Sequence, residues 1–261
     1  MNCIEDGWMR KVGIMSMQRI ANYGSFLQAY ALKQLIEEVG CNAEFVDYHV
    51  GAPVITENAD SKNKVVRKIE KGLETFRYRA PLAHKLSFIR YKQSFAQKYM
   101  PLLGITDEMN YNPTVDCLVI GSDEVFNCIQ KNSNVGYSPE LFGKNNHAKK
   151  LITYAASFGN TTLEKLEKYK KANEVGALLK KFDAISVRDA NSGTIVEQLT
   201  GKEPVYNLDP VLTYDYMNCC DKIPQVQTNE KYLILYAYAG RISNDEADWI
   251  AAYAKKKNLK V

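Results

Sequence analysis

The sequence predicts an α/β fold built on a doubly wound parallel sheet. Short apolar segments of strand length alternate along the chain with longer segments of helical periodicity. Five of the apolar segments end directly in small or polar residues, as expected of strands whose carboxyl ends share one edge of a parallel sheet. The composition agrees with a globular protein, because 46% of the residues are hydrophobic and 25% are charged.

The chain opens with a predicted strand–helix–strand unit. Residues 11–17 form the first strand, and a turn at 21–25 leads into a helix that ends at Gly40. The apolar stripe of this helix consists of Leu27, Ala31, Leu35 and Val39. Residues 43–48 form the second strand. A helical crossover between two strands implies that they pair in parallel.

A basic insertion at about residues 55–105 interrupts this alternation. Its periodicity predicts two amphipathic helices, one over residues 65–76 and one after Pro81. Residues 61–98 hold eleven Lys or Arg and two Glu. Such a segment suits peripheral contact with an anionic membrane surface, or a helical hairpin packed on the sheet with a solvated basic face. No recognised nucleic-acid module surrounds it, so nucleic acid is not an expected partner.

The α/β pattern resumes after the insertion. The predicted strands cover residues 116–120, 151–155, 184–187 and 205–208, and the predicted helices cover 163–182 and 192–199. An aperiodic polar stretch then suggests that an N-terminal Rossmann-like domain, residues 1–220, ends there. From residue 230 we expect the truncated start of a second α/β domain, with a strand at 232–238, a helix at 245–257 and the first residues of a strand at 259–261.

Composition and the spacing of Cys and His indicate where in the cell the protein acts and argue against metal and disulfide chemistry. No apolar run is long enough to cross a bilayer, and residues 1–10 do not resemble a secretory signal, so we expect a cytoplasmic protein. The six cysteines include no C-x-x-C pair, and the three histidines fall in no metal or triad pattern. The sequence therefore predicts no metal, no cofactor and no disulfide framework.

The strand ends supply the candidate functional residues. Asp123 follows a buried strand and is predicted to hold a hydroxyl group or to act as a base. Arg188 is predicted to bind an anion, with an ion pair to a neighbouring acid as the alternative. The Gly24 turn opens a helix whose free N–H groups suit phosphate or carboxylate. The other candidates are Asn22, Tyr23, Ser25, Gly121, Ser122, Glu124, Ser157, Phe158, Gly159, Asp189 and Asp209, for several of which helix capping is the alternative.

Five of these segments also resemble motifs of a known family. They are Asn22-Tyr23-Gly24-Ser25 with Leu27-Gln28-Ala29-Tyr30-Ala31-Leu32, Gly121-Ser122-Asp123-Glu124-Val125-Phe126-Asn127, Tyr154-Ala155-Ala156-Ser157-Phe158-Gly159, Ser186-Val187-Arg188-Asp189 with Ser192, and Asp209-Pro210-Val211-Leu212. In this order, over about residues 11–213, they resemble the polysaccharide pyruvyl transferase family. Glu124 and Phe126 depart from the Gln and Trp usual in that family, and Glu124 adds a negative charge near the expected donor site.

The resemblance implies a two-domain fold like that of GT-B glycosyltransferases, with the active site between the domains. It implies transfer of a pyruvyl group from phosphoenolpyruvate to a sugar of a bacterial surface polysaccharide, on a glycan or lipid-linked oligosaccharide acceptor, with formation of a ketal. Asp123 and Arg188 would be the catalytic candidates on this chain. Key basic residues, including a histidine, are expected from the C-terminal domain, so this chain alone is expected to be inactive. The alternatives are a GT-B glycosyltransferase that uses a nucleotide sugar, and a non-catalytic member that binds a glycan or a protein.

Overall fold

The computed structural model describes residues 4–5, 8–55, 81–130, 135–222, 229–237 and 241–261. The chain divides into two compact units, Met1–Asp215 and Tyr216–Val261. Each unit is described by itself below. The first contains all of the predicted site residues.

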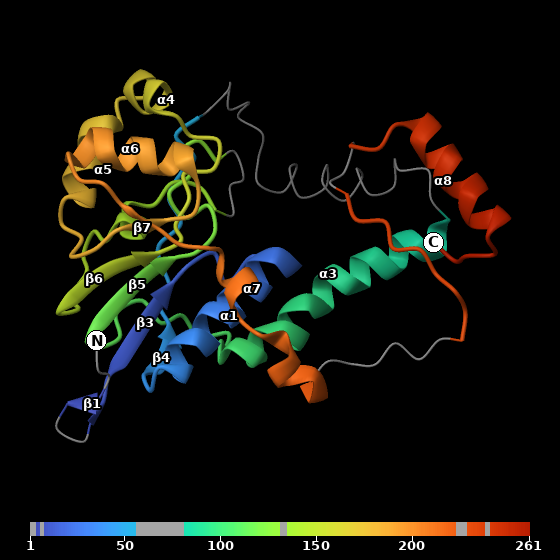
Figure 1. Ribbon diagram of the computed structural model, residues 1–261, viewed down its shortest axis with the longest axis horizontal. Helices are drawn as coiled ribbons and strands as arrows, with labels where there is room; N and C mark the ends of the chain where they lie inside the picture. The colour runs from blue at the N-terminus through green and yellow to red at the C-terminus, as the bar shows by residue number, and fades with distance from the viewer. Residues whose placement is uncertain (1–3, 6–7, 56–80, 131–134, 223–228, 238–240) are drawn as a thin grey trace. The chain divides into compact units, whose positions relative to one another are not determined.

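The first unit is built around a parallel sheet of four strands in the order β4-β3-β5-β6 (Figure 1). Two single parallel bridges, Ile152–Ala184 and Ala156–Val187, connect β6 to a further parallel pair, β7 with β8. A short antiparallel pair, β1 with β2, precedes the sheet. The strands are β1 (Ile4–Glu5), β2 (Trp8–Met9), β3 (Lys11–Met15), β4 (Asn42–Phe45), β5 (Cys117–Gly121), β6 (Lys150–Tyr154), β7 (Ser186–Val187) and β8 (Val205–Tyr206). The prediction of an α/β fold with a parallel sheet is therefore confirmed.

Helices lie on both sides of this sheet. Figure 1 shows α5 and α6 on one side and α1 with α7 on the other. The described helices of the first unit are α1 (Tyr23–Glu38), α3 (Leu82–Leu103), η1 (Pro139–Phe142), α4 (Leu163–Lys168), α5 (Ala172–Leu179), α6 (Ala190–Thr200) and α7 (Pro210–Thr213). The core includes Leu118 and Ile120 of β5 with Val175 of α5 and Ile195 of α6. Burial of such side chains is the main force that holds the layers together.

The buried face of α1 differs from the predicted one. Leu27 and Val39, two members of the predicted apolar stripe, are 37% and 64% exposed. The buried positions are Ser25, Phe26, Gln28, Ala29, Tyr30, Ala31 and Leu32, so Ala31 of the predicted stripe is buried as expected. The predicted stripe is wrong at Leu27 and Val39 because it followed apolar residues alone, whereas the buried face also includes the polar Ser25 and Gln28.

The single helix predicted over residues 163–182 is two helices, α4 and α5. The first closes at Lys170, whose φ of +57° is left-handed, and Lys171 N–H donates to the Leu166 carbonyl at 2.7 Å. This is the hydrogen bond that ends helices in a Schellman turn. Nine residues separate Leu166 from Val175, so on one straight helix they would face opposite sides. The break allows both side chains to be buried, at 1% and 0% exposed.

The predicted helix after Pro81 is confirmed as α3, while the predicted helix over residues 65–76 lies outside the described residues. Aromatic side chains join α3 to α1. The Tyr23 ring lies 5.5 Å from the Phe95 ring and 5.3 Å from the Tyr99 ring, and its hydroxyl is 3.2 Å from that of Tyr99. Phe26 contacts Tyr99 in the same cluster.

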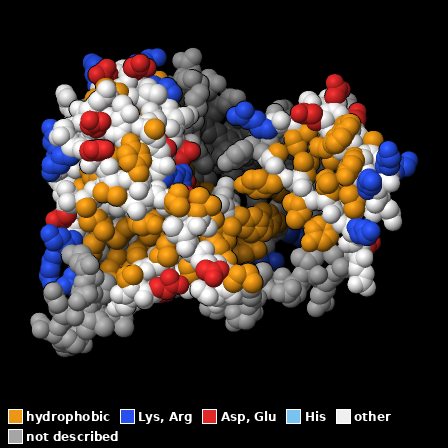
Figure 2. All heavy atoms as spheres, viewed as in Figure 1, with side chains coloured by type: hydrophobic (Ala, Val, Ile, Leu, Met, Phe, Trp, Pro, Cys, Tyr) orange, Lys and Arg blue, Asp and Glu red, His pale blue; other side chains and the backbone are white. Residues whose placement is uncertain are grey.

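The second unit contains η2 (Tyr216–Lys222) and α8 (Asn244–Lys256). Ser243 and Glu246 form a capping box at the start of α8, which confirms the predicted helix. Figure 2 shows apolar side chains gathered over α8, with acidic side chains near its start and basic ones near its end. The predicted strand at 232–238 is wrong for its described part. Among the described residues of this stretch, only Tyr232 forms a bridge, with Lys260. Ile234 and Tyr236 are 78% and 82% exposed, because no described strand lies beside them.

The cysteines correct one expectation. Cys41 is disulfide-bonded, whereas Cys117, Cys128 and Cys219 are free. Spacing along the chain could not reveal this bond, because a disulfide depends on which distant residues the fold brings together. Burial raises the pKa of the Cys117 thiol to about 11. Within the described ranges, no helix is both long and apolar enough to span a bilayer.

Candidate functional site

The candidate site lies where the strand order of the sheet reverses. The chain passes from β3 to β4 on one side, and later returns to place β5 on the other side of β3. The carboxyl ends of β3 and β5 therefore form a switch point, which is where open α/β sheets bind ligands. The segments that leave these two ends meet directly, because Ser25 Oγ donates to Asp123 Oδ2 at 2.8 Å.

Asp123 is held firmly at this point. Besides the contact with Ser25, its Oδ1 accepts from the Glu124 backbone N–H at 2.9 Å. Its backbone has a left-handed φ of +72°. Two residues earlier, Gly121 admits no side chain, because a Cβ there would lie 2.2 Å from the Tyr154 carbonyl oxygen. The local backbone thus fixes the carboxylate, which keeps lone pairs free for a further donor.

Arg188 connects three strand ends. It follows β7 and pairs closely with Asp209, which follows β8, through Nη1 and Oδ2. Its Nη2 lies 3.8 Å from Asp123 Oδ1. Arg188 Nη1 also donates to Gln28 Oε1 at 3.3 Å. The ion-pair alternative considered for Arg188 therefore describes this structure, and an anionic ligand would have to share the guanidinium with two carboxylates.

The turn before α1 does not offer the free N–H groups that were expected. Asn22 Oδ1 accepts from the Gly24 N–H at 2.7 Å and from the Ser25 N–H at 3.4 Å. Asn22 is thus the N-cap of α1. An anion does contact this first turn, because the Asp123 carboxylate accepts from Ser25 Oγ. Tyr23 packs in the aromatic cluster with α3, and burial is the first cause of its raised pKa.

Glu124 belongs to a neighbouring group. Its Oε2 accepts from Asn127 Nδ2 at 2.8 Å, and Asn127 also bonds to Asn160 and Thr161. Gly159, with a left-handed φ of +54°, lies over this carboxylate, and a Cβ there would be 2.5 Å from Glu124 Oε2. The structure therefore brings Glu124 and Gly159, two predicted site residues, into one group, and Asn127 holds the Glu124 carboxylate.

Three other predicted residues serve the fold in this structure. Ser157 Oγ accepts from the Gly159 N–H, and Asp189 is the N-cap of α6, where it accepts from the backbone and hydroxyl of Ser192. Phe158 is 0% exposed and contacts the rings of Phe126 and Phe142. It therefore has no exposed surface with which to contact a substrate.

Two residues near Asp123 were not singled out by sequence reasoning. Gln28 Oε1 accepts from Ser122 Oγ at 2.6 Å as well as from Arg188. Its signal in the sequence is its position one helical turn after Ser25. Tyr48 is the other. Its burial, followed by the charge of Asp123, raises the pKa of its hydroxyl to about 12.

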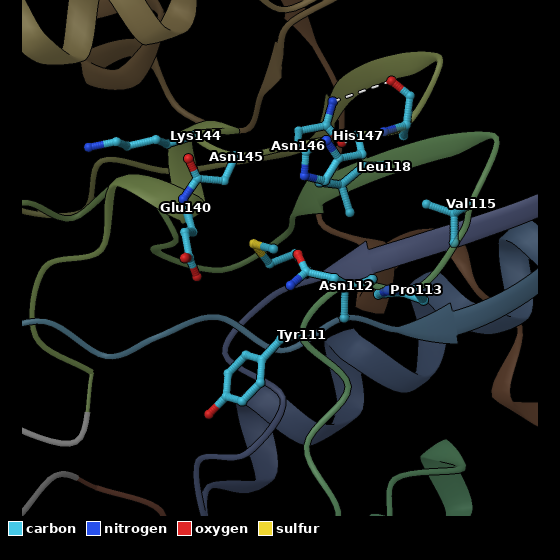
Figure 3. Close-up of a pocket in the computed structure, with 13 residues that line it drawn as sticks. Tyr111, Asn112, Pro113, Val115, Leu118, Glu140, Lys144, Asn145, Asn146 and His147 are labelled. Atoms are coloured by element: carbon cyan, nitrogen blue, oxygen red, sulfur yellow. Dashed lines mark hydrogen bonds between the residues drawn. The ribbon is translucent and has the colours of Figure 1, made fainter.

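Two cavities of the described region lie away from these residues. One of about 40 Å³ is lined by residues that include Tyr111, Glu140 and His147 (Figure 3). Another of about 300 Å³ lies beside β4 and the end of α3. No predicted site residue lines either one. Among the described residues, no group of three His, Cys, Asp or Glu is placed to hold a metal ion.

Fold and site together define an α/β protein with a polar cluster at the switch point of a parallel sheet. The family model for polysaccharide pyruvyl transferase matches residues 22–258 of the chain, so the protein belongs to that family. The family implies a transferase. Searches of curated proteins and of solved structures found no match.

Proposed function

We propose that the protein transfers a pyruvyl group from phosphoenolpyruvate to a sugar of a bacterial surface polysaccharide precursor and closes it into a ketal. The observation that carries this proposal is the Asp123 carboxylate, fixed at the switch point beside Arg188 in a member of this family. Carboxylate and guanidinium groups are the types that a hydroxyl acceptor and an anionic donor require.

The proposed reaction balances without a redox partner. The methylene carbon of phosphoenolpyruvate takes a proton, which leaves the adjacent carbon cationic. One sugar hydroxyl attacks that carbon, phosphate departs with its bridging oxygen, and a second hydroxyl closes the ring. Of the two hydroxyl protons, one replaces the proton spent on the methyl group and the other leaves with phosphate. The reaction therefore needs an acid, a base and cations for the donor.

In the proposal, Asp123 serves the acceptor and Arg188 serves the donor. Asp123 contacts an acceptor hydroxyl and accepts its proton. Arg188 turns toward the carboxylate or phosphate of the donor by giving up part of its pairing with Asp209. The general acid is not assigned to a described residue. We further propose a glycan or lipid-linked oligosaccharide as acceptor. We also propose peripheral membrane contact through residues 61–98, whose sequence contains eleven Lys or Arg and only two Glu.

The test is direct. Full-length protein is incubated with phosphoenolpyruvate and a panel of glycan acceptors, and both phosphate and pyruvylated product are measured. The proposal expects the two to form in equal amounts. Absence of both with every acceptor counts against it. Thermal unfolding in the presence of different ligands tests the alternative of a glycosyltransferase. Stabilisation by a uridine or guanosine diphosphate but not by phosphoenolpyruvate would favour that alternative.

A further inference from the structure

Gln28 lies inside the candidate site although it is a polar residue on a helix. It is 4% exposed and lies on α1, one turn after Ser25. Its side-chain oxygen accepts from Ser122 Oγ at 2.6 Å and from Arg188 Nη1 at 3.3 Å. Two donors on one amide oxygen are more than helix packing requires, and they fix the orientation of the side chain.

The orientation follows from the chemistry of the partners. A guanidinium has five donors and no acceptor, so the Gln28 atom that faces Arg188 must be the oxygen. The amide nitrogen, with two N–H groups, therefore points away from Arg188. It donates to no residue that the structure describes. It is also not among the buried atoms without a partner, which are Glu44 Oε1 and Tyr137 Oη in the described residues, because it keeps contact with solvent.

The charge at this point favours a neutral ligand. Arg188 is paired with Asp209 and lies near Asp123, so one positive charge meets two negative ones. The three side chains together carry one net negative charge, so an anion binds here only if Arg188 gives up part of its pairing with Asp209, whereas a neutral group needs no such change. Hydroxyl groups carry no charge, and each of them both donates and accepts a hydrogen bond.

We propose that Gln28 Nε2 and the Asp123 carboxylate form a donor–acceptor pair that binds the hydroxyls of the acceptor sugar. Both side chains are within reach of one guanidinium, and Ser122, which contacts Gln28, adjoins Asp123 in the chain. One hydroxyl accepts from Gln28, and another donates to Asp123. This inference rests on the proposed function, since it names the subsite for the two hydroxyls that ketal formation consumes.

The experiment observes the Gln28 side chain directly. The full chain is labelled with ¹⁵N, and the side-chain amide signals of Gln28 and Gln34 are assigned by their loss in Gln28→Glu and Gln34→Glu. Gln34 is the matched control, because it lies on the same helix and donates to Glu37 away from the site. Methyl glycosides of glucose, galactose and mannose are then titrated, and phosphoenolpyruvate is titrated separately. Affinities are compared with those of Gln28→Met and Gln34→Met.

The proposal expects a glycoside to shift the Gln28 amide signals but not those of Gln34. Gln28→Met should weaken that glycoside about tenfold, the effect of one lost hydrogen bond, and Gln34→Met should not. The proposal is overturned if the Gln28 signals stay unmoved by every glycoside, or if only phosphoenolpyruvate moves them. If a glycoside shifts Gln28 while no acceptor supports phosphate release, the transfer reaction is wrong and the sugar subsite stands.

Discussion

At the residue scale, the Asp123 carboxylate is the group whose surroundings are most closely specified. Ser25 and Arg188 approach it from two other segments, and the Glu124 backbone N–H donates to it from its own loop. A carboxylate held in this way cannot reorient freely, so a hydroxyl beside it meets a fixed acceptor. Preorganisation of this kind is what makes a general base effective.

Removing the charge of Asp123 tests this directly. Asp123→Asn keeps the size of the side chain and an acceptor for Ser25, but it removes the basic site. In full-length protein we expect phosphate release from phosphoenolpyruvate to fall by roughly 100-fold or more. The exposed Asp107→Asn is the matched control and should retain the parent rate. A variant at Asp123 with the parent rate would show that this carboxylate takes no proton in the reaction.

Tyr48 gives the stability of the protein a pH dependence of known sign. Its folded pKa is about 12, raised mainly by burial from an ordinary value of 10. The folded state therefore holds this proton more tightly than the unfolded state does. Its stabilising contribution is complete below about pH 10 and is lost as the pH rises toward about 12.

We accordingly expect the free energy of unfolding to fall between about pH 10 and about pH 12. Tyr48→Phe should reduce the slope of the free energy of unfolding against pH in this range. Urea unfolding at a series of pH values measures both quantities. An identical slope in the parent protein and in Tyr48→Phe would assign the dependence to other groups.

At the element scale, helix starts decide which strand-end residues remain open to ligands. Asn22 caps α1, Asp189 caps α6 and Asp209 caps α7. In each case a side chain satisfies backbone N–H groups that the helix itself cannot satisfy. A polar residue at the end of a strand can therefore either cap the next helix or contact a ligand. Its hydrogen bonds in the structure distinguish these two roles.

Asp189 is the clearest example of a strand-end residue that caps a helix. Asp189→Ala should lower the free energy of unfolding by about 1 kcal/mol, the usual effect of a lost N-cap, because Ser192 loses its partner. Ligand affinity should stay at the parent value. Denaturant unfolding and a ligand titration give the two readouts, with the exposed Thr194→Ala as the control on the same helix. A large loss of affinity at parent stability would instead restore Asp189 as a substrate contact.

At the scale of the whole molecule, an aromatic cluster supports the switch-point loops. The Phe126 ring stacks on Phe142 at 4.7 Å and contacts Phe158 at 5.2 Å. Phe126 and Phe158 come from the loops that follow β5 and β6, and the Phe126 N–H donates to the Ser157 carbonyl at 3.0 Å. The core therefore continues directly beneath the candidate site.

Truncation within this cluster should be costly. Phe142→Ala is expected to lower the free energy of unfolding by about 3–5 kcal/mol, because it leaves a cavity among buried rings. Phe88→Ala, at a half-exposed position on α3, provides a matched control and should cost much less. Thermal unfolding followed by circular dichroism checks both variants. Similar losses in the two would mean that the cluster does not support the core.

The sequence by itself determined the α/β class, the parallel pairing of the first two strands, and the strand ends that carry polar residues. These depend on local periodicity and on the rule that parallel strands share a carboxyl edge. It also carried the motifs that identify the family. Segment boundaries shifted by a few residues, because the ends of elements depend on hydrogen bonds that periodicity does not show.

Only the tertiary structure decided how the polar residues divide their tasks. It pairs Arg188 with Asp209, gives the N–H groups of the first turn to Asn22, and assigns Glu124 to Asn127. It also brings Gln28 of α1 to Ser122 after β5, 94 residues later in the chain. The physical reason is that charge pairing and hydrogen bonding act over a few ångströms in space. Which distant side chains come that close is set by how helices and strands pack, and no local pattern in the sequence records it.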